Sequence, residues 1–320
     1  MLLLFTEPAW SNRGTQATGA SPGLALCKPR GSLQQPVAAG ESDKLPNLPA
    51  SPMVRDDVRL ANGQRKGQKM GVVAEYRTNQ PSLAGELIAH AVASINAAKH
   101  SAAPFPHIVF REFFPKSFYE TLIGSIPTQG YDPITSTGTR MALRLYGTHI
   151  KDVEPVLQPL WEAASAVLTS KEVEDAIRRR LHDGLEIRAR GDKVPSAEDL
   201  KLVAKPVLYR DSDGYRIKPH PDTRKKVVTM QLYCPPDSSQ ENLGTTLYKA
   251  SIKGLMHLDS YCLEPVKTIP FLPNLGYAFV VLKAYHSLKN MSWHGRPPIQ
   301  TDRPRISILN TFYMNADVGF

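Results

Sequence analysis

The sequence predicts an α+β fold in which helices come first and an antiparallel sandwich or jelly roll follows. Between residues 80 and 184 apolar residues recur with the period of a helix, and from Leu185 onward they alternate with polar residues, as in strands. Turn-rich segments such as DSDG and PPDSSQENLG separate the alternating runs. Helices followed by many short strands are typical of α+β proteins that contain a sandwich or jelly roll.

The helical half begins after Ser82, a good N-cap residue, with apolar residues on one face: Leu83, Leu87, Ile88, Val92 and Ile95. A short strand bounded by prolines is expected within residues 104–115. Further helices are predicted over residues 116–126, 156–170 and 171–184, the last of which begins after Ser170 and closes near Gly184.

The second half contains the period-two runs. Their alternation predicts strands over residues 185–190, 201–210, 215–220, 226–234, 244–250, 265–271, 277–283 and 305–314. Residues 1–75 differ from both halves, because they are rich in Gly, Pro, Ser, Ala and Gln and lack any period. They are predicted to be disordered, which leaves one domain over residues 76–320, with helices in 80–184 and a β-rich core in 185–320.

Composition narrows the class of protein. The chain has 320 residues, 42% of them hydrophobic, which is enough for a substantial core. No apolar run reaches the ~18 residues that span a bilayer, and the three cysteines are scattered, so a cytoplasmic setting is expected. The net charge of +9 is compatible with simple solubility or with an anionic substrate or partner. Nothing indicates a nucleic-acid surface.

Two pairs of polar residues stand at strand positions in the second half. His220 and Asp222 are i and i+2, so one face of a strand can present both, and Pro221 between them indicates a strand end or sheet edge. Arg305 and Ser307 form a second such pair, suited to binding a carboxylate. Two ligands do not hold a metal, so a third is expected from downstream, where His286 and His294 are both available.

Taken in order, these residues form a two-histidine, one-carboxylate set beside a carboxylate clamp, a ligand set typical of non-haem iron(II) oxygenases. The order H-x-D, distal His, R-x-S resembles the 2-oxoglutarate- and iron(II)-dependent oxygenases from about Phe105 to the C-terminus. The segment PFPHIVFREFFP resembles the entry to the prolyl-hydroxylase-like branch of that family.

The resemblance implies a double-stranded β-helix that binds iron(II) and uses 2-oxoglutarate as cosubstrate. It implies that His220, Asp222 and the distal His hold iron. It also implies that Arg305 and Ser307 bind the far carboxylate of 2-oxoglutarate, with Tyr209 as a further contact. The implied reaction is hydroxylation by dioxygen, with release of succinate and carbon dioxide, of a small-molecule or peptide substrate that no motif identifies.

The distal ligand is predicted to be His294 rather than His286, because its spacing to Arg305 and its SWHG setting suit the family better. We also expect PPIQTDRP to be a short turn that makes the strands of His294 and Arg305 antiparallel neighbours. Two rival functions are a cupin-like metal-binding module without catalysis and a nucleic-acid dealkylase of the same superfamily. The dealkylases carry a second arginine, and the corresponding position here is Thr311.

Overall fold

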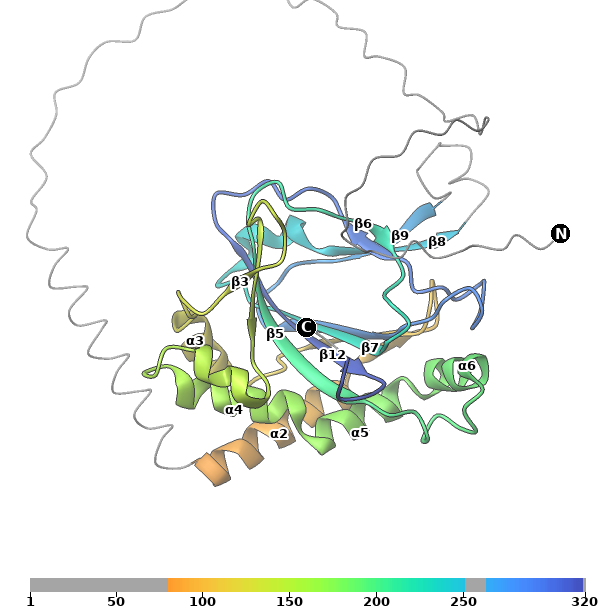
Figure 1. Cartoon of the computed structure of the whole chain (residues 1–320), viewed down its shortest axis with the longest axis horizontal. Coiled ribbons are helices and arrows are strands. Elements are labelled where there is room, and N and C mark those ends of the chain that lie inside the picture. Colours follow the sequence, from red (N-terminus) through yellow and green to blue (C-terminus); the bar gives the residue numbers. More distant parts are fainter. Residues whose placement is uncertain (1–79, 251–262, 319–320) are drawn as a thin grey trace, which may run out of the picture. The chain divides into compact units, whose positions relative to one another are not determined.

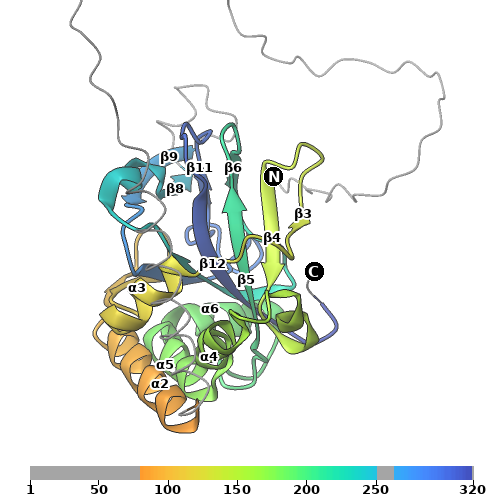
Figure 2. The same cartoon turned by 90° about the vertical axis from the view of Figure 1, so that its left-hand side faces the viewer.

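The computed structural model describes residues 80–250 and 263–318. The segment predicted to be disordered, residues 1–75, lies outside the described residues. Within them, two antiparallel sheets form a β-sandwich, and helices cover the outer face of the larger sheet (Figures 1 and 2). The predicted α+β class, a double-stranded β-helix with N-terminal helices, is confirmed.

Among the described residues the larger sheet has eight strands. Its order is β1 (Lys99–Ser101), β2 (His107–Arg111), β10 (Leu275–Val280), β7 (Lys226–Tyr233), β12 (Arg305–Tyr313), β5 (Val203–Asp211), β4 (Arg140–Arg144) and β3 (Asp132–Pro133). The smaller sheet has four, in the order β6 (Ile217–His220), β11 (His294–Arg296), β8 (Thr245–Ala250) and β9 (Leu263–Ile269). Most predicted strands appear within a few residues of their expected bounds.

The helical layer consists of α2 (Gln80–Asn96), α3 (Lys116–Gly124), α4 (Gln158–Thr169), α5 (Lys171–Arg180) and α6 (His182–Asp192), and two 3-10 turns lie at Gly147–Asp152 and Ser238–Leu243. Helix α5 begins as predicted, since the Ser170 hydroxyl accepts a hydrogen bond from the Val173 amide. Helix α2, in contrast, begins at Gln80, before Ser82.

Two hydrophobic cores fill the spaces between the layers. One lies between the helices and the larger sheet and includes Trp161 of α4 and Ile308 of β12. The other lies between the two sheets and is rich in aromatic side chains, including Tyr277 and Phe279 of β10, packed with Leu247 of β8. The second core therefore sets the spacing between the two sheets.

The strand predicted over residues 185–190 is wrong, because these residues belong to α6. The run LEIRAR alternates, but Leu185 and Ala189 are also four residues apart, and both are buried on one face of the helix. Gly184 does not end a helix. A β-carbon there would lie 2.8 Å from Cγ2 of Val280, so this glycine allows α6 to approach β10 closely.

Arg188 of α6 is one of the polar residues whose alternation predicted a strand, and it is fully buried. Its guanidinium donates hydrogen bonds to the carbonyl oxygens of Arg224, Lys226 and Val281, and it is paired with Asp192. Helix α6 is thus tied to the segment that enters β7 and to the end of β10. No helix in the described parts of the chain is both long and apolar enough to span a membrane.

Candidate metal centre and anion-binding cavity

Two histidines meet because their strands pair. His220 ends β6 at the edge of the smaller sheet, where Pro219 and Pro221 are tolerated because an edge strand leaves some amides unpaired. In the register of β6 with β11, His220 lies opposite His294. Their ring centroids are 4.5 Å apart.

Asp222 follows β6 and completes a three-residue cluster with these histidines. One ligand atom from each of the three residues lies within 4.8 Å of the others. Asp222 Oδ1 is 3.8 Å from Nε2 of His220, and Oδ2 is 3.8 Å from Nε2 of His294. The structure thus brings together the three side chains that the sequence analysis grouped.

Hydrogen bonds select the same tautomer for both imidazoles. Nδ1 of His220 lies 3.0 Å from the carbonyl oxygen of Lys218, and Nδ1 of His294 lies 2.9 Å from that of Ser292. A carbonyl accepts only, so each Nδ1 carries the proton and each Nε2 presents a lone pair to the cluster. Burial lowers the pKa of His294 to about 4, so its imidazole is neutral at neutral pH, as a metal ligand must be.

The Asp222 carboxylate is ionised and fixed in place. Its Oδ1 accepts a hydrogen bond from Lys226 Nζ at 2.7 Å, and its Oδ2 accepts one from Thr229 Oγ1 at 2.6 Å. Burial acts to raise the pKa of Asp222, but Lys226 and the two histidines outweigh it and hold that pKa well below its usual range. The cluster therefore offers one carboxylate and two imidazole nitrogens.

His286 has a different role. Its side chain is fully buried, with Nε2 3.1 Å from Asp192 Oδ1, and its Nδ1 accepts a hydrogen bond from the Lys283 amide at 2.9 Å. It thereby fixes the start of the segment between β10 and β11. Of the two distal histidines considered from the sequence, the structure brings His294 to His220 and Asp222.

The predicted hairpin between the strands of His294 and Arg305 is wrong. Strand β11 belongs to the smaller sheet and β12 to the larger, so residues 297–304 cross from one layer to the other. This crossing is fixed by backbone hydrogen bonds in which Ile299 donates to Tyr215 and accepts from Gly214. Local turn chemistry could not reveal which sheet each strand would join.

Arg305 is the first residue of β12 and is 1% exposed. Its Nε donates to the Leu243 carbonyl oxygen at 2.8 Å, and its Nη1 lies 3.2 Å from Ser307 Oγ and 3.4 Å from Asp211 Oδ2. The structure thus joins Arg305 with Ser307, as the R-x-S pattern predicts. Nη2 of Arg305 is buried and has no hydrogen-bond partner among the described residues.

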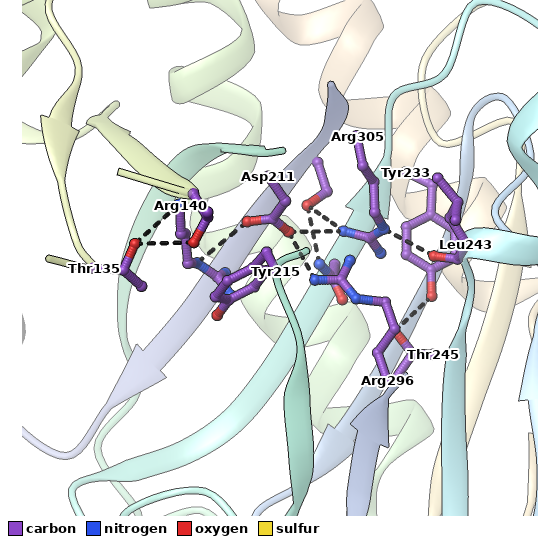
Figure 3. A network of polar contacts seen from close by, with 12 residues as sticks. Thr135, Arg140, Asp211, Tyr215, Tyr233, Leu243, Thr245, Arg296 and Arg305 are labelled. Carbon is purple, nitrogen blue, oxygen red and sulfur yellow. Dashed lines mark hydrogen bonds and ion pairs between the residues drawn. The ribbon is translucent and has the colours of Figure 1, made fainter. Parts of the chain in front are cut away.

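Two further arginines share Asp211 with Arg305, and sequence reasoning missed both (Figure 3). Nη2 of Arg296 lies 3.0 Å from Asp211 Oδ2, and Nε of Arg140 lies 3.6 Å from Oδ1. Arg296 could have been found, since it is two residues beyond His294 on the same face of a strand. Arg140 could not, because β4 was not predicted.

Tyr209 of β5 is buried in the same region, and the guanidinium carbon of Arg140 lies 3.7 Å from the centre of its ring. Its expected contact with a cosubstrate remains a prediction. Gln231 and Tyr277 were not singled out from the sequence. Gln231 donates to Ser307 Oγ at 3.0 Å and accepts from the Tyr277 hydroxyl at 2.6 Å, so these residues hold the Ser307 side of the site.

One cavity of about 240 Å³ is shared by the metal cluster and the arginines. Its lining includes the three residues of the metal cluster and Arg140, Arg296 and Arg305. The arrangement can bind a cation and an anion in the same cavity. A ligand that chelates a metal and ends in a carboxylate suits both groups of residues.

No protein-family model and no curated protein sequence matches the chain. Several solved structures match it. A prolyl-4-hydroxylase from Pseudomonas putida is 15% identical, with a TM-score of 0.38, covering 72% of this chain and 100% of that one. An oxidoreductase of the 2OG-Fe(II) oxygenase family from Burkholderia pseudomallei is 6% identical, with a TM-score of 0.42, covering 71% and 90%.

A viral collagen prolyl hydroxylase from Paramecium Bursaria Chlorella virus-1 is 10% identical, with a TM-score of 0.34, covering 65% of this chain and 94% of that one. The predicted likeness to 2-oxoglutarate–iron(II) oxygenases, prolyl hydroxylases among them, is thus found in structure. At these identities and TM-scores, the chemistry has to be argued from the residues of the chain itself.

Proposed function

We propose that this chain is an iron(II)- and 2-oxoglutarate-dependent dioxygenase that hydroxylates a small-molecule or peptide substrate. The observation that carries the proposal is the content of a single cavity. It combines two imidazoles and an ionised carboxylate with a buried guanidinium whose Nη2 has no partner among the described residues.

The donor set fits iron(II). His220, Asp222 and His294 would hold the metal through Nε2, a carboxylate oxygen and Nε2, and three such ligands leave further coordination positions open. When bound, iron(II) with 2-oxoglutarate and dioxygen supplies the oxidising power for hydroxylation. Thr229 and Lys226 keep the Asp222 carboxylate oriented and charged, and the carbonyls of Lys218 and Ser292 keep the imidazoles in the ligating tautomer.

Arg305 would bind the far carboxylate of 2-oxoglutarate. Its Nη2 can donate to that carboxylate, while Ser307 and Leu243 already hold the other guanidinium nitrogens in position. Because the guanidinium is buried, a carboxylate placed on it is little screened by water.

Anaerobic titration with iron(II) and 2-oxoglutarate tests the proposal. A weak visible band from metal-to-keto charge transfer should appear only when both are present, and succinate should form when oxygen and a suitable substrate are admitted. Iron binding without the band would instead indicate a metal-binding module without this cosubstrate.

Asp222→Ala is expected to abolish iron binding and the band, since it removes the anionic donor and leaves two imidazoles. Asp152→Ala is the control, because Asp152 is also a carboxylate beside a histidine, His149, and lies outside the cluster and the cavity lining. Iron binding equal to wild type in Asp222→Ala would refute the assignment.

A further inference from the structure

The arginine cluster carries more positive charge than one carboxylate can neutralise. Arg140, Arg296 and Arg305 are 8%, 5% and 1% exposed, and they share one buried carboxylate, Asp211. Three guanidinium groups and one carboxylate leave an excess of two positive charges in a buried site. Uncompensated buried charge is costly, so the cluster favours the binding of anions.

The register of the larger sheet places Arg140 and Arg305 on opposite sides of Asp211. Arg140 of β4 and Arg305 of β12 are the two cross-strand partners of Asp211, one on each flank of β5. Arg140 faces Oδ1, and Arg305 faces Oδ2 (Figure 3). A single carboxylate on the free Nη2 of Arg305 therefore leaves the Arg140 side without a ligand.

Tyr215 connects Arg140, which faces Oδ1 of Asp211, with Arg296, which is bound to Oδ2. The Tyr215 hydroxyl accepts a hydrogen bond from Arg140 Nη1. The centre of the Tyr215 ring lies 5.0 Å from the guanidinium carbon of Arg140 and 5.4 Å from that of Arg296. Nε of Arg296 is buried and has no hydrogen-bond partner among residues 80–250 and 263–318, so a donor remains available here.

Given the proposed function, a count of the charges in the cavity shows which of them the cosubstrate offsets and which remain for the substrate. Iron(II), Asp222 and Lys226 together carry a net charge of two, and the arginine cluster carries an excess of two. The two carboxylates of 2-oxoglutarate offset two of these four charges, so two positive charges remain. We infer that Arg140 and Arg296, with Tyr215 between them, form a second anion subsite that binds a carboxylate of the primary substrate.

A carboxylate fits this subsite better than a larger anion. The Arg140 guanidinium is stacked on the Tyr209 ring, so its donors point outward in the plane of the group, where a planar acceptor can meet them. The cavity of about 240 Å³ also has to hold 2-oxoglutarate, which leaves room for a small acid or an acidic side chain. Burial and repulsion from Arg296 lower the pKa of Arg305 to about 10, whereas for Arg140 burial is outweighed by Asp211 and Tyr215, which raise its pKa.

Acetate is the probe, titrated by calorimetry into protein loaded anaerobically with iron(II) and 2-oxoglutarate, with acetamide as the neutral isostere. We expect one saturable acetate site and none for acetamide. Arg140→Gln should weaken acetate binding at least about ten-fold, the loss of one charge-assisted pair, and Arg140→Lys should weaken it less. Arg144→Gln is the matched control, on the same strand but outside the cavity lining.

The outcomes that overturn the inference differ from those that overturn the proposed function. Absence of the visible band on adding 2-oxoglutarate defeats the proposed function. With the band present, acetate binding that survives both Arg140 variants, or that shifts the band because acetate binds iron, defeats the second subsite. Loss of the band in folded Arg140→Gln and Arg140→Lys would assign Arg140 to the cosubstrate instead. Inorganic phosphate binding more tightly than acetate through Arg140 would overturn the carboxylate assignment.

Discussion

Residues of one type take different roles in this molecule according to the few groups that surround them. His220 and His294 present a free Nε2 to a carboxylate, whereas the Nε2 of His286 is engaged by Asp192 and its Nδ1 by a backbone amide. Sequence spacing favoured His294, but the argument assumed a hairpin that does not exist. His294 nevertheless lies beside His220, because β11 pairs with β6 in the smaller sheet.

Alanine substitutions should separate the two distal histidines. His294→Ala is expected to lose iron, because a neutral donor disappears from the cluster. His286→Ala should keep iron but unfold at lower denaturant concentration, by roughly 1–3 kcal/mol, since the buried Lys283 amide and Asp192 each lose a partner. Iron titration and urea unfolding measure the two effects. The opposite pattern of iron loss would show that the ligand assignment is wrong.

Arg305→Ala should raise the dissociation constant for 2-oxoglutarate at least ten-fold, because a charge-assisted pair contributes ~1.5–3 kcal/mol. Arg305→Lys should restore only part of the affinity, as an ammonium cannot reproduce the planar fork. The visible band, followed against 2-oxoglutarate concentration, gives both constants. Arg303→Ala is the control, since Arg303 is exposed two residues away. Unchanged cosubstrate affinity in Arg305→Ala would rule out the clamp.

At the scale of elements, prediction succeeded where burial and local pattern agree. Strands β7 and β12 alternate or are continuously apolar and have few competing interpretations. Prediction failed for α6, because its alternation of apolar and polar residues also fits a helix in which Arg188 is buried. Only tertiary contacts, such as those of Arg188, decide between strand and helix. The short strand β4 was not predicted, and Arg140 was missed with it. A strand at His294 was expected, but beside β12 and not in the smaller sheet, and Arg296 on it was not singled out.

Helix α5 offers a direct test of a local signal. Ser170→Ala removes the side chain that accepts from the Val173 amide, and the expected cost is ~1 kcal/mol of unfolding free energy. Ser170→Asp should retain most of the stability, because a carboxylate can cap the same amide. Urea denaturation of the three proteins measures the difference. Equal stability of Ser170→Ala and wild type would mean that packing alone fixes the start of α5.

At the scale of the whole molecule, His107 links stability to pH. It lies on β2 of the larger sheet, fully buried, with Nδ1 2.8 Å from the Phe105 carbonyl oxygen and Nε2 3.3 Å from Lys267 Nζ on the smaller sheet. Burial lowers the pKa of His107 to about 4 from 6.5. Between these values the unfolded chain binds more protons, so the stability from neutral His107 is complete above pH 6.5 and is lost as the pH falls towards 4.

The expected loss from His107 is about 1.4 kcal/mol at pH 5.5 and approaches about 3 kcal/mol near pH 4. Urea unfolding of wild type and His107→Gln at pH 7.5 and 5.5 should show a smaller pH effect in the variant. His149→Gln, which alters an exposed histidine, should keep the wild-type dependence. If the unfolding free energies of wild type and His107→Gln depended on pH identically, His107 would not be the source of the pH dependence.

The anchoring of Arg188 has a consequence for the thermodynamics of metal binding. Its guanidinium holds the carbonyls of Arg224 and Lys226, so the segment that carries Asp222 is ordered by the helical layer before any ion arrives. The conformational entropy of that segment is then lost during folding and not during binding. Substitution of Arg188 would leave the three candidate metal ligands unchanged yet make metal binding entropically less favourable. The change would be visible in the temperature dependence of the affinity for the metal.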